Sequence, residues 1–215
     1  MKEIISIHIG SSGINPGKAF WKLKSYENGI GEDGVLTNKK DMSEVNSFFF
    51  ETIKGEYKAR ALFVDTDSNT TEDLKKFEMQ NIIDEGMIFN NLSGPSSNWA
   101  SSHLLEKELT DKFIDKLTCL AEICDSLEGI QTFYSLHGAF SSGFGSSLSS
   151  NLSDQFGDKF KFNIQYNSFL SSNSNTFENY NTLLSIAKYI IFNLVNVIFQ
   201  FFMITILYIN IALIF

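Results

Sequence analysis

Short apolar runs recur along the chain, and most are followed by a stretch in which apolar residues have helical spacing. Runs of four to eight residues rich in Ile, Val and Phe predict buried strands. We expect strands at residues 4–9, 59–64, 87–92, 130–134 and 160–166. Strands that alternate with helices predict an α/β fold, in which helices flank a parallel sheet and the crossovers are right-handed.

The intervening segments predict the helices. The first carries Trp21 and follows a turn at 10–13, a second ends near Gln80, a third is one long amphipathic helix over 102–126, and a fourth spans 146–156. One face of the third helix is a predicted core stripe: Leu105, Leu109, Phe113, Leu117, Leu120 and either Ile123 or Cys124. Residues 29–55 are interpreted as an excursion whose aromatic run, 48–50, must pack against something.

Composition narrows the classes of partner. The 215 residues are 43% hydrophobic, which is ample for one core, and the net charge of -8 argues against direct binding to nucleic acid. Cys119 and Cys124 have the spacing of neither a disulfide nor a zinc site, so we expect two buried thiols in a reducing compartment. The charged start, Lys2 and Glu3, does not resemble a secretory signal and predicts a cytosolic protein.

The candidate chemistry lies where strands run into small residues. The stretch Ser135–Gly145 follows an apolar run and precedes a helix, an arrangement that favours phosphate through backbone N–H groups and the helix dipole. The alternative is an ordinary surface loop, because no Lys or Arg stands nearby. The turn at 10–13 is not a P-loop, since Ser12 and Ala19 occupy positions that need Gly and Ser or Thr. His8 alternates with apolar neighbours, which indicates a buried, hydrogen-bonded imidazole.

Two carboxylates, Asp65 and Asp67, follow the predicted second strand. The carboxyl ends of parallel strands are where open α/β sheets bind ligands, so this pair could hold Mg²⁺ through water. Asp67 is equally well placed to cap the following helix. The sequence leaves both roles open.

With the elements laid out, the chain resembles the α-tubulins over residues 1 to about 185. The matches, in order, are Met1–Gly10, Trp21–Leu23 with Glu27–Ile30, Phe48–Thr52, Ala61–Asp65, Asn98–Ala100 with His103, Leu127–Gly129 and Glu178–Asn181. The resemblance implies a Rossmann-like domain of the tubulin/FtsZ GTPase type that binds GTP and Mg²⁺. It also implies a cytoplasmic cytoskeletal role: microtubules built from α–β heterodimers, with β-tubulin and other tubulin subunits as partners.

The same resemblance assigns the site residues. GTP-binding positions correspond to Gly10, Ser11, Ser12, Asp67, Ser135, Gly138, Ala139, Phe140, Ser141 and Ser174, and the metal position to Asp67. Ser11 replaces a glutamine, and His137–Gly143 replaces the family's run of three glycines, threonine, glycine, serine and glycine. We expect Ala139 and Phe140 to intrude on the ligand and weaken binding. The loop that promotes hydrolysis in α-tubulins lies beyond the matching region, so no catalytic residue is assigned.

After residue 185 the likeness fades into a hydrophobic tail, 186–215, which is uncharged from Tyr189 onward. Its length predicts a C-terminal apolar helix that could span a membrane, although Asn193, Asn196, Gln200 and Asn210 weaken that interpretation. Translation through a gene break in an AT-rich genome would give the same composition. The alternatives to a truncated tubulin domain are therefore a membrane-anchored, tubulin-like interaction protein and a non-functional fragment.

Overall fold

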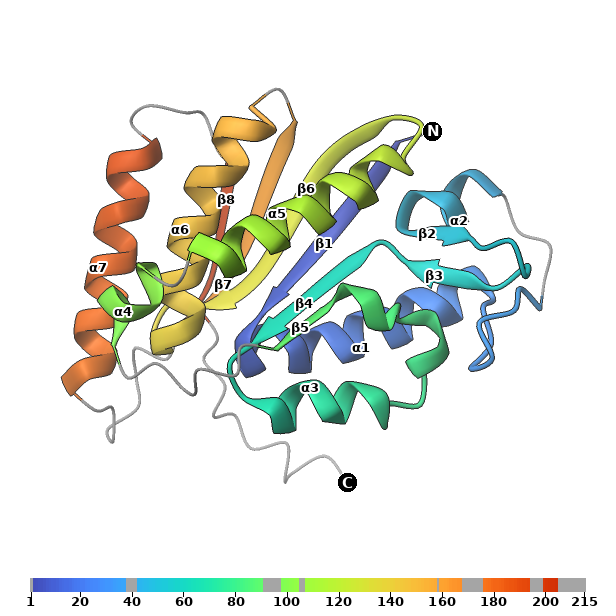
Figure 1. The fold of residues 1–215 in the computed structure, drawn as a ribbon, viewed down its shortest axis with the longest axis horizontal. Helices are drawn as coiled ribbons and strands as arrows, with labels where there is room; N and C mark the ends of the chain where they lie inside the picture. Colours follow the sequence, from blue (N-terminus) through green and yellow to red (C-terminus); the bar gives the residue numbers. More distant parts are fainter. Residues whose placement is uncertain are drawn as a thin grey trace.

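A six-stranded parallel sheet runs through the middle of the described part of the chain (Figure 1). The computed structural model describes residues 2–37, 42–90, 98–104, 107–157, 159–167, 176–193 and 199–204. In spatial order the strands are β5 (Ile88–Asn90), β4 (Ala61–Asp65), β1 (Glu3–Ile9), β6 (Leu127–Ser135), β7 (Phe160–Asn167) and β8 (Phe199–Ile204). The predicted parallel sheet with flanking helices is confirmed.

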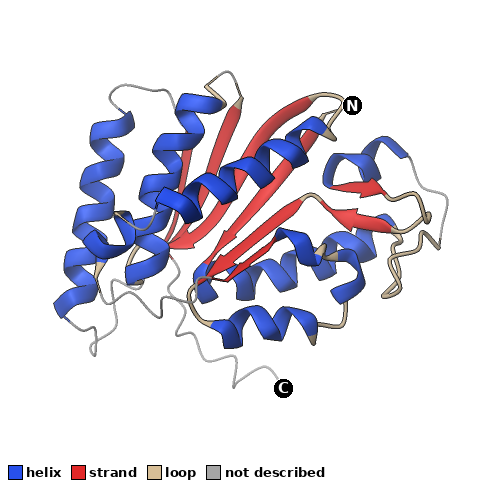
Figure 2. Cartoon of the chain, in the orientation of Figure 1, coloured by secondary structure: helices blue, strands red, loops and turns tan. Residues whose placement is uncertain are grey.

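Helices cover both faces of this sheet (Figure 2). The helices α1 (Gly10–Asn28) and α3 (Ser68–Lys75) pack on one face, and α5 (Lys107–Glu122) and α6 (Ala139–Gln155) pack on the other. Helix α7 (Thr176–Asn193) lies beside α6, and the short α4 (Trp99–His103) contacts both. The excursion after α1 forms α2 (Met42–Phe48) and the antiparallel pair β2 (Phe49–Glu51) and β3 (Tyr57–Ala59).

The central strand β1 divides its side chains between two cores. Ile5, Ile7 and Ile9 are fully buried in the cluster that contains the apolar faces of α5 and α6. His8 points the other way, where its ring stacks between Phe63 and Phe133, with ring centroids 4.9 and 4.6 Å away. All side chains from Ile5 to Ile9 are buried, as in central strands of parallel sheets, and the two polar ones, Ser6 and His8, are hydrogen-bonded.

The imidazole of His8 is buried but fully bonded. Its Nδ1–H donates to the carbonyl oxygen of Gly13 at 3.2 Å, and its Nε2 accepts from the indole N–H of Trp21 at 3.0 Å. Burial lowers the pKa of His8 to about 3, because the charged form would lose its water, and the bond to Gly13 opposes this only in part. The prediction of a structural, hydrogen-bonded histidine is confirmed.

Several helix boundaries differ from the predicted ones. The predicted helix over 102–126 is two helices, α4 and α5, and α3 ends at Lys75 rather than near Gln80. The core stripe is confirmed for Phe113, Leu117 and Leu120, which are buried, and Leu109 and Cys124 are partly buried against the same cluster. Of the alternatives Ile123 and Cys124, Ile123 is exposed, and Leu105 lies outside the described residues. Of the two thiols predicted to be buried, Cys119 is exposed and only Cys124 is partly buried, because Cys119 lies off the stripe that faces the sheet.

Helix α6 starts seven residues earlier than predicted, at Ala139 instead of Ser146. The stretch 139–145 is therefore helical, although its Gly and Ser residues have low intrinsic helix propensity. Phe140, Phe144, Leu148 and Leu152 recur at intervals of four and are all buried against the sheet. Burial of this stripe outweighs the propensity of the residues between them.

The described residues of the tail do not form one continuous apolar helix, contrary to the prediction. Helix α7 ends at Asn193, and Phe199–Ile204 form β8, which pairs with β7 in parallel register. A run rich in Phe has high strand propensity, and the free edge of β7 offers it backbone hydrogen bonds. Among the described residues, none of the helices has both the length and the apolar character needed to cross a membrane.

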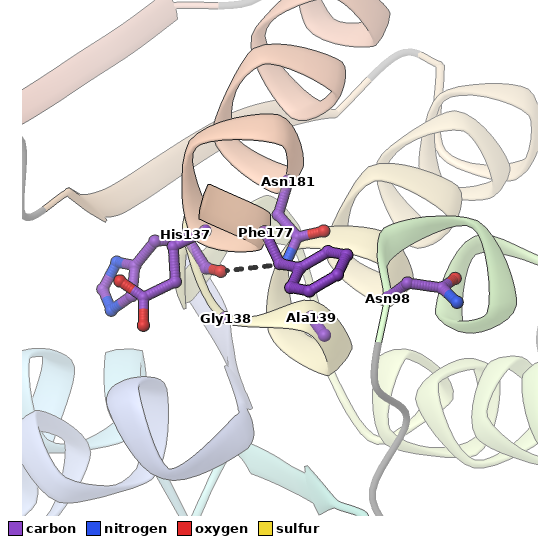
Figure 3. Close-up of a pocket in the computed structure, with 7 residues that line it drawn as sticks. Asn98, His137, Gly138, Ala139, Phe177 and Asn181 are labelled. Atoms are coloured by element: carbon purple, nitrogen blue, oxygen red, sulfur yellow. Dashed lines mark hydrogen bonds between the residues drawn. The ribbon is translucent and has the colours of Figure 1, made fainter. Parts of the chain in front are cut away.

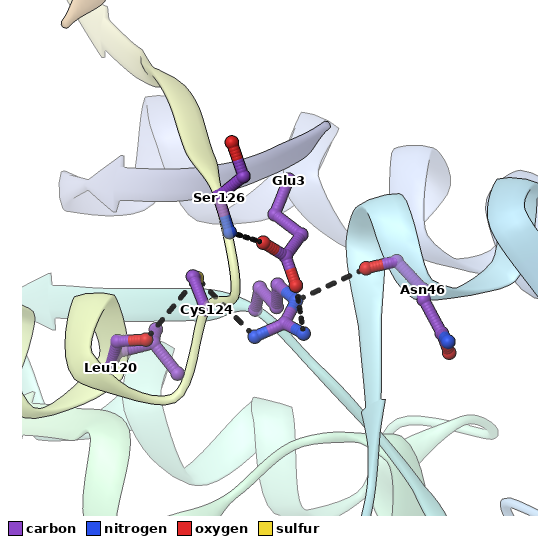
Figure 4. Close-up of polar contacts among 6 residues, drawn as sticks. Glu3, Asn46, Leu120, Cys124 and Ser126 are labelled. Atoms are coloured by element: carbon purple, nitrogen blue, oxygen red, sulfur yellow. Dashed lines mark hydrogen bonds and ion pairs between the residues drawn. The ribbon is translucent and has the colours of Figure 1, made fainter. Parts of the chain in front are cut away.

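A buried ion pair links the start of β1 to three other segments (Figure 4). The Arg60 guanidinium donates to Glu3 Oε1 at 3.1 Å, to the Asn46 carbonyl oxygen at 3.2 Å and to Cys124 Sγ at 3.4 Å. The second oxygen of Glu3 accepts from the backbone N–H of Ser126 at 2.6 Å. Both charged side chains are at least 96% buried, so each charge depends on the other to offset the free-energy cost of its removal from water.

Removing one partner of this pair should strongly destabilise the fold. Glu3→Gln leaves the Arg60 charge buried without a counter-ion, and we expect a loss of about 3 kcal/mol or more in the free energy of unfolding, measured in urea. The double variant Glu3→Leu with Arg60→Met should lose less free energy of unfolding than the sum of the losses in the single variants Glu3→Leu and Arg60→Met. Single variants as stable as the parent chain would contradict this.

Because of His8, the folded chain should also become less stable as the pH is lowered. In the unfolded chain an ordinary histidine binds its proton near pH 6.5, whereas folded His8 stays neutral down to about pH 3. Between these values the unfolded state binds one more proton, so unfolding becomes easier by about 1.4 kcal/mol for each pH unit lost. Urea unfolding at pH 7, 6 and 5 measures this slope. His8→Gln should flatten it, and an unchanged slope in that variant would rule out this assignment.

Candidate functional site

The order of strands reverses at the centre of the sheet. After β1 the chain builds outward through β4 and β5, and then returns to place β6 on the other side of β1. The helices that follow β1 and β6, α1 and α6, start at the carboxyl ends of these neighbouring strands and pack on opposite faces. A crevice at such a reversal is the usual ligand site of open α/β sheets.

Helix α1 begins directly at the end of β1, without the separate turn that the sequence predicted. Gly10 has a φ of 68°, a left-handed conformation that favours glycine, and this lets the chain pass from strand to helix in one residue. No side chain caps the helix, and its first turn contains no acidic residue. Ser11 is exposed at this end, and Ser12 is half-buried.

Helix α6 presents a second uncapped start beside the first. Its N-cap residue is Gly138, which has no side chain to accept from the first-turn N–H groups, and this turn also lacks an acidic residue. A Cβ placed on Gly10 would lie 3.1 Å from the Cβ of Ser141, so the two helix starts are in contact. Each helix start carries partial positive charge and unpaired N–H groups, and together they favour an anion.

Two buried serines shape the turn that leads into α6. The hydroxyls of Ser135 and Ser141 lie 2.7 Å apart and share a hydrogen bond. Ser135 Oγ also accepts from the N–H of Gly138, and Ser141 Oγ approaches the Ser135 carbonyl oxygen, both at 3.3 Å. The hydroxyls hold the turn, and the predicted contacts of both residues with a ligand stay predictions.

A cavity of about 420 Å³ opens at the start of α6 (Figure 3). The residues that line it are Asn98, His137, Gly138, Ala139, Phe177, Glu178 and Asn181. They come from the residue before α4, the turn into α6, the first residue of α6 and the first turns of α7. Its size suits part of a nucleotide-sized ligand.

Asn181 ties together the three segments around this cavity. Its side-chain N–H donates to the carbonyl oxygen of His137 at 3.2 Å, and its side-chain oxygen accepts from the backbone N–H of Trp99 at 3.0 Å. The residue is 5% exposed, so both bonds are shielded from water. Asn181 therefore fixes α7 and α4 against the turn into α6.

His137 and Glu178 are the titratable groups in the cavity wall. The Nδ1 atom of His137 is buried and has no hydrogen-bond partner among the described residues. Burial lowers the pKa of His137, and the negative charge of Glu178 opposes that shift. At neutral pH the cavity wall therefore carries one carboxylate and no compensating cation among its lining residues.

At the end of β4, Asp65 and Asp67 have different environments. Asp65 is 5% exposed, and one of its oxygens accepts from the N–H groups of Thr66 and Asp67, while its Oδ2 has no partner among the described residues. Burial raises the pKa of Asp65. Asp67 is exposed and caps α3 by accepting from the N–H of Asn69 at 2.9 Å, which confirms the cap. An unpartnered buried oxygen beside an exposed carboxylate fits a hydrated cation.

The structure places the Phe140 ring in the core, and its effect on a ligand stays a prediction. The sequence predicted that this ring would intrude on the ligand, yet the side chain is 7% exposed and stacks on Phe144 within the core, with ring centroids 5.4 Å apart. The helical geometry of α6 turns the ring toward the sheet, and it is not among the residues that line the cavity. It still lies beside the start of α1, because a Cβ on Gly10 would be 3.9 Å from its Cδ1. Ala139, by contrast, does line the cavity, and Ser174 lies outside the described residues.

Sequence reasoning missed the contribution of α7 and α4. Asn98, Phe177, Glu178 and Asn181 line the cavity but were not assigned to a site. Residues 178–181 are among the segments that carry the family resemblance, and this was the available signal. His137 was quoted only as part of the degenerate glycine-rich stretch.

Comparison with known proteins gives one family match and several similar proteins. Residues 3–201 match the model of the Tubulin/FtsZ family, GTPase domain. The chain is 30% identical over 152 residues to the tubulin alpha-1 chain of Schizosaccharomyces pombe, and 32% identical to the tubulin alpha-2B chain of Physarum polycephalum and the tubulin alpha chain of Encephalitozoon cuniculi. Each match covers 66% of this chain and 33% of the relative, so the matched region spans a third of those proteins.

The two residues at the start of α6 should respond differently to substitution. Phe140→Thr removes a buried ring from the core and should lower the free energy of unfolding by about 3 kcal/mol. Ala139→Gly, at the cavity wall, should cost at most about 1 kcal/mol through helix propensity. Urea denaturation of both variants measures the difference. Equal stabilities would mean that the Phe140 ring is not in the core.

Proposed function

The chain belongs to the Tubulin/FtsZ family, and we propose that it binds a guanine nucleotide with the phosphates at the adjoining starts of α1 and α6. The single observation that carries this proposal is the contact between two uncapped helix N-termini at the strand reversal. Together they offer the phosphates two sets of backbone N–H groups in the absence of any Lys or Arg in the cavity wall. The cavity beside them, between α6 and α7, is the proposed place for the rest of the nucleotide.

Asp65 and Asp67 would hold Mg²⁺ in this proposal, with water completing its coordination. When bound, the ion would neutralise phosphate charge, which this site otherwise leaves to backbone dipoles. The Oδ2 atom of Asp65 supports the assignment, because it is buried with no hydrogen-bond partner among the described residues and a cation would compensate it. Asp67 can serve while it caps α3, since its cap uses one oxygen.

The site lacks contacts that the family resemblance assigns to side chains. Phe140 replaces a threonine hydroxyl, Ser11 replaces the longer glutamine, and the hydroxyls of Ser135 and Ser141 bond to each other. Ala139 adds a methyl group at the cavity wall. We therefore expect weaker binding than in a tubulin with the full glycine-rich loop, because hydroxyl contacts are lost and larger side chains stand where that loop has glycine and threonine.

The wider role proposed is that of a tubulin-type structural subunit in the cytoplasmic cytoskeleton. The relatives' names and the family match support tubulin subunits as the class of partner. The proposed heterodimer partner is β-tubulin. The matched region corresponds to a third of those relatives, so assembly and GTP hydrolysis belong to the proposal and rest on kinship.

A negative charge placed at the start of α6 should prevent nucleotide binding without unfolding the chain. Ala139→Glu puts a carboxylate at the cavity wall, where it repels phosphate, while an acidic side chain in the first helical turn stabilises the helix by about 0.5 kcal/mol. We expect the affinity for GDP, measured by isothermal titration calorimetry with Mg²⁺, to fall at least about tenfold, which corresponds to about 1.4 kcal/mol.

Ala139→Gln is the matched control, because it has the same length and no charge. It should keep most of the affinity that Ala139→Glu loses. If the two variants bind GDP equally well, the phosphates do not lie at this helix start. If the parent chain binds no guanine nucleotide, the proposed function is wrong.

A further inference from the structure

The geometry points to His137 as a specificity-determining residue that supplies, when protonated, the positive charge the cavity needs to hold an anionic nucleotide. This inference rests on the proposed function and adds to it a residue that departs from the family pattern. In the resemblance to α-tubulins, residue 137 aligns with a glycine of the glycine-rich loop, so the imidazole is a feature of this chain.

The charged side chains around the cavity do not include one that attracts an anion. Among its lining residues Glu178 carries a negative charge at pH 7, and none is Lys or Arg. The first turns of α1 and α6 contain no acidic side chain. Among the described residues, Asp65 and Asp67 at the end of β4 are further acidic groups at this edge of the sheet. With His137 neutral, Glu178 repels any anion that enters, and backbone dipoles alone must overcome this.

The position of His137 suits that role. The residue immediately precedes the N-cap of α6, and its carbonyl oxygen is held by Asn181, so the backbone that carries the ring is fixed. Its Nδ1 is buried without a partner among the described residues, although most buried polar atoms are bonded. Figure 3 shows the imidazole in the cavity wall beside the turn into α6. A bound phosphate would give this nitrogen an acceptor and its charge a counter-ion.

His103 is the natural comparison, because it lies nearby but not in the cavity wall. It stacks on Trp99 at 4.3 Å between centroids, and its Nδ1–H donates to the carbonyl oxygen of Gly143 at 3.3 Å. Its imidazole therefore already has a partner, supplied by α6. Lys188 of α7 also lowers the pKa of His103, after burial, which is the larger cause.

Binding of an anion should therefore take up a proton at His137. In the free chain burial holds the pKa of His137 below its ordinary value, and a bound phosphate would raise it. Between these two values affinity increases as pH falls, by at most about tenfold per pH unit for one group. The terminal phosphate of the nucleotide, with a pKa of about 6, loses charge in the same range and acts in the opposite direction. Comparison of variants at each pH cancels that contribution.

The test is GDP binding to the full chain at pH 8, 7 and 6 by isothermal titration calorimetry, in two buffers with different ionisation enthalpies. The parent chain should bind GDP about fivefold or more tighter than His137→Gln at pH 6 and should take up a proton, while the two should converge at pH 8. His103→Gln should behave as the parent chain. NMR titration of the His137 ring in the parent chain, with and without GDP, should show a higher pKa when GDP is bound.

The outcomes separate this inference from the proposed function. Equal pH dependence in the parent chain and His137→Gln, or a His137 pKa that GDP does not change, overturns the role of His137 while nucleotide binding stands. If His137→Gln does not fold, the NMR titration of the parent chain decides the question alone. No GDP binding at either pH 6 or pH 8 overturns both.

Discussion

The close approach of α1 to the sheet is the constraint on which the rest of the site depends. A Cβ on Gly13 would lie 2.2 Å from the carbonyl oxygen of Phe133 in β6, so any larger residue would push the helix away from the strands. With the left-handed Gly10 at its start, α1 leaves β1 within one residue and runs directly over β1 and β6. This places the first turn of α1 against the first turn of α6.

Buried polar groups hold the elements around this contact. The His8 imidazole forms hydrogen bonds with Gly13 in the first turn of α1 and with Trp21 further along the same helix. One side chain of β1 therefore fixes the helix at two points along its length. At the opposite end of β1, Glu3 and Arg60 connect the strand with the segments that carry Asn46, Cys124 and Ser126. Since unpaired buried polar groups are costly, these bonds specify one arrangement of helices on the sheet.

Strands β1, β4, β5, β6 and β7 of the sheet could be predicted because short, largely apolar runs have few alternatives in a chain of this size. The start of helix α6 could not be predicted, because its Gly and Ser content is typical of a loop. The apolar stripe from Phe140 to Leu152 stabilises the helix only when it packs against the sheet. For the same reason the burial of Phe140 against the sheet was not predicted. The contribution of Asn181 to the site depends on α7 packing beside α6, a long-range contact without a local signal.

The end of the described chain shows a related limit. Composition alone does not separate a helix in lipid from a strand in a sheet, and Phe199–Ile204 pair with β7 because that strand offers an open edge. Asp67 was undecided between two roles from sequence, and the structure gives it the cap without removing its second oxygen from the site.

The central claim is that two helix starts act together on one anion. The most direct measurement is an NMR titration of the ¹⁵N-labelled chain with GDP and Mg²⁺, followed through the backbone amide signals. The account predicts that the signals of Gly10–Ser12 and Ala139–Ser141 shift together and saturate with a single dissociation constant. Shifts confined to one helix start, or located away from both, would contradict it.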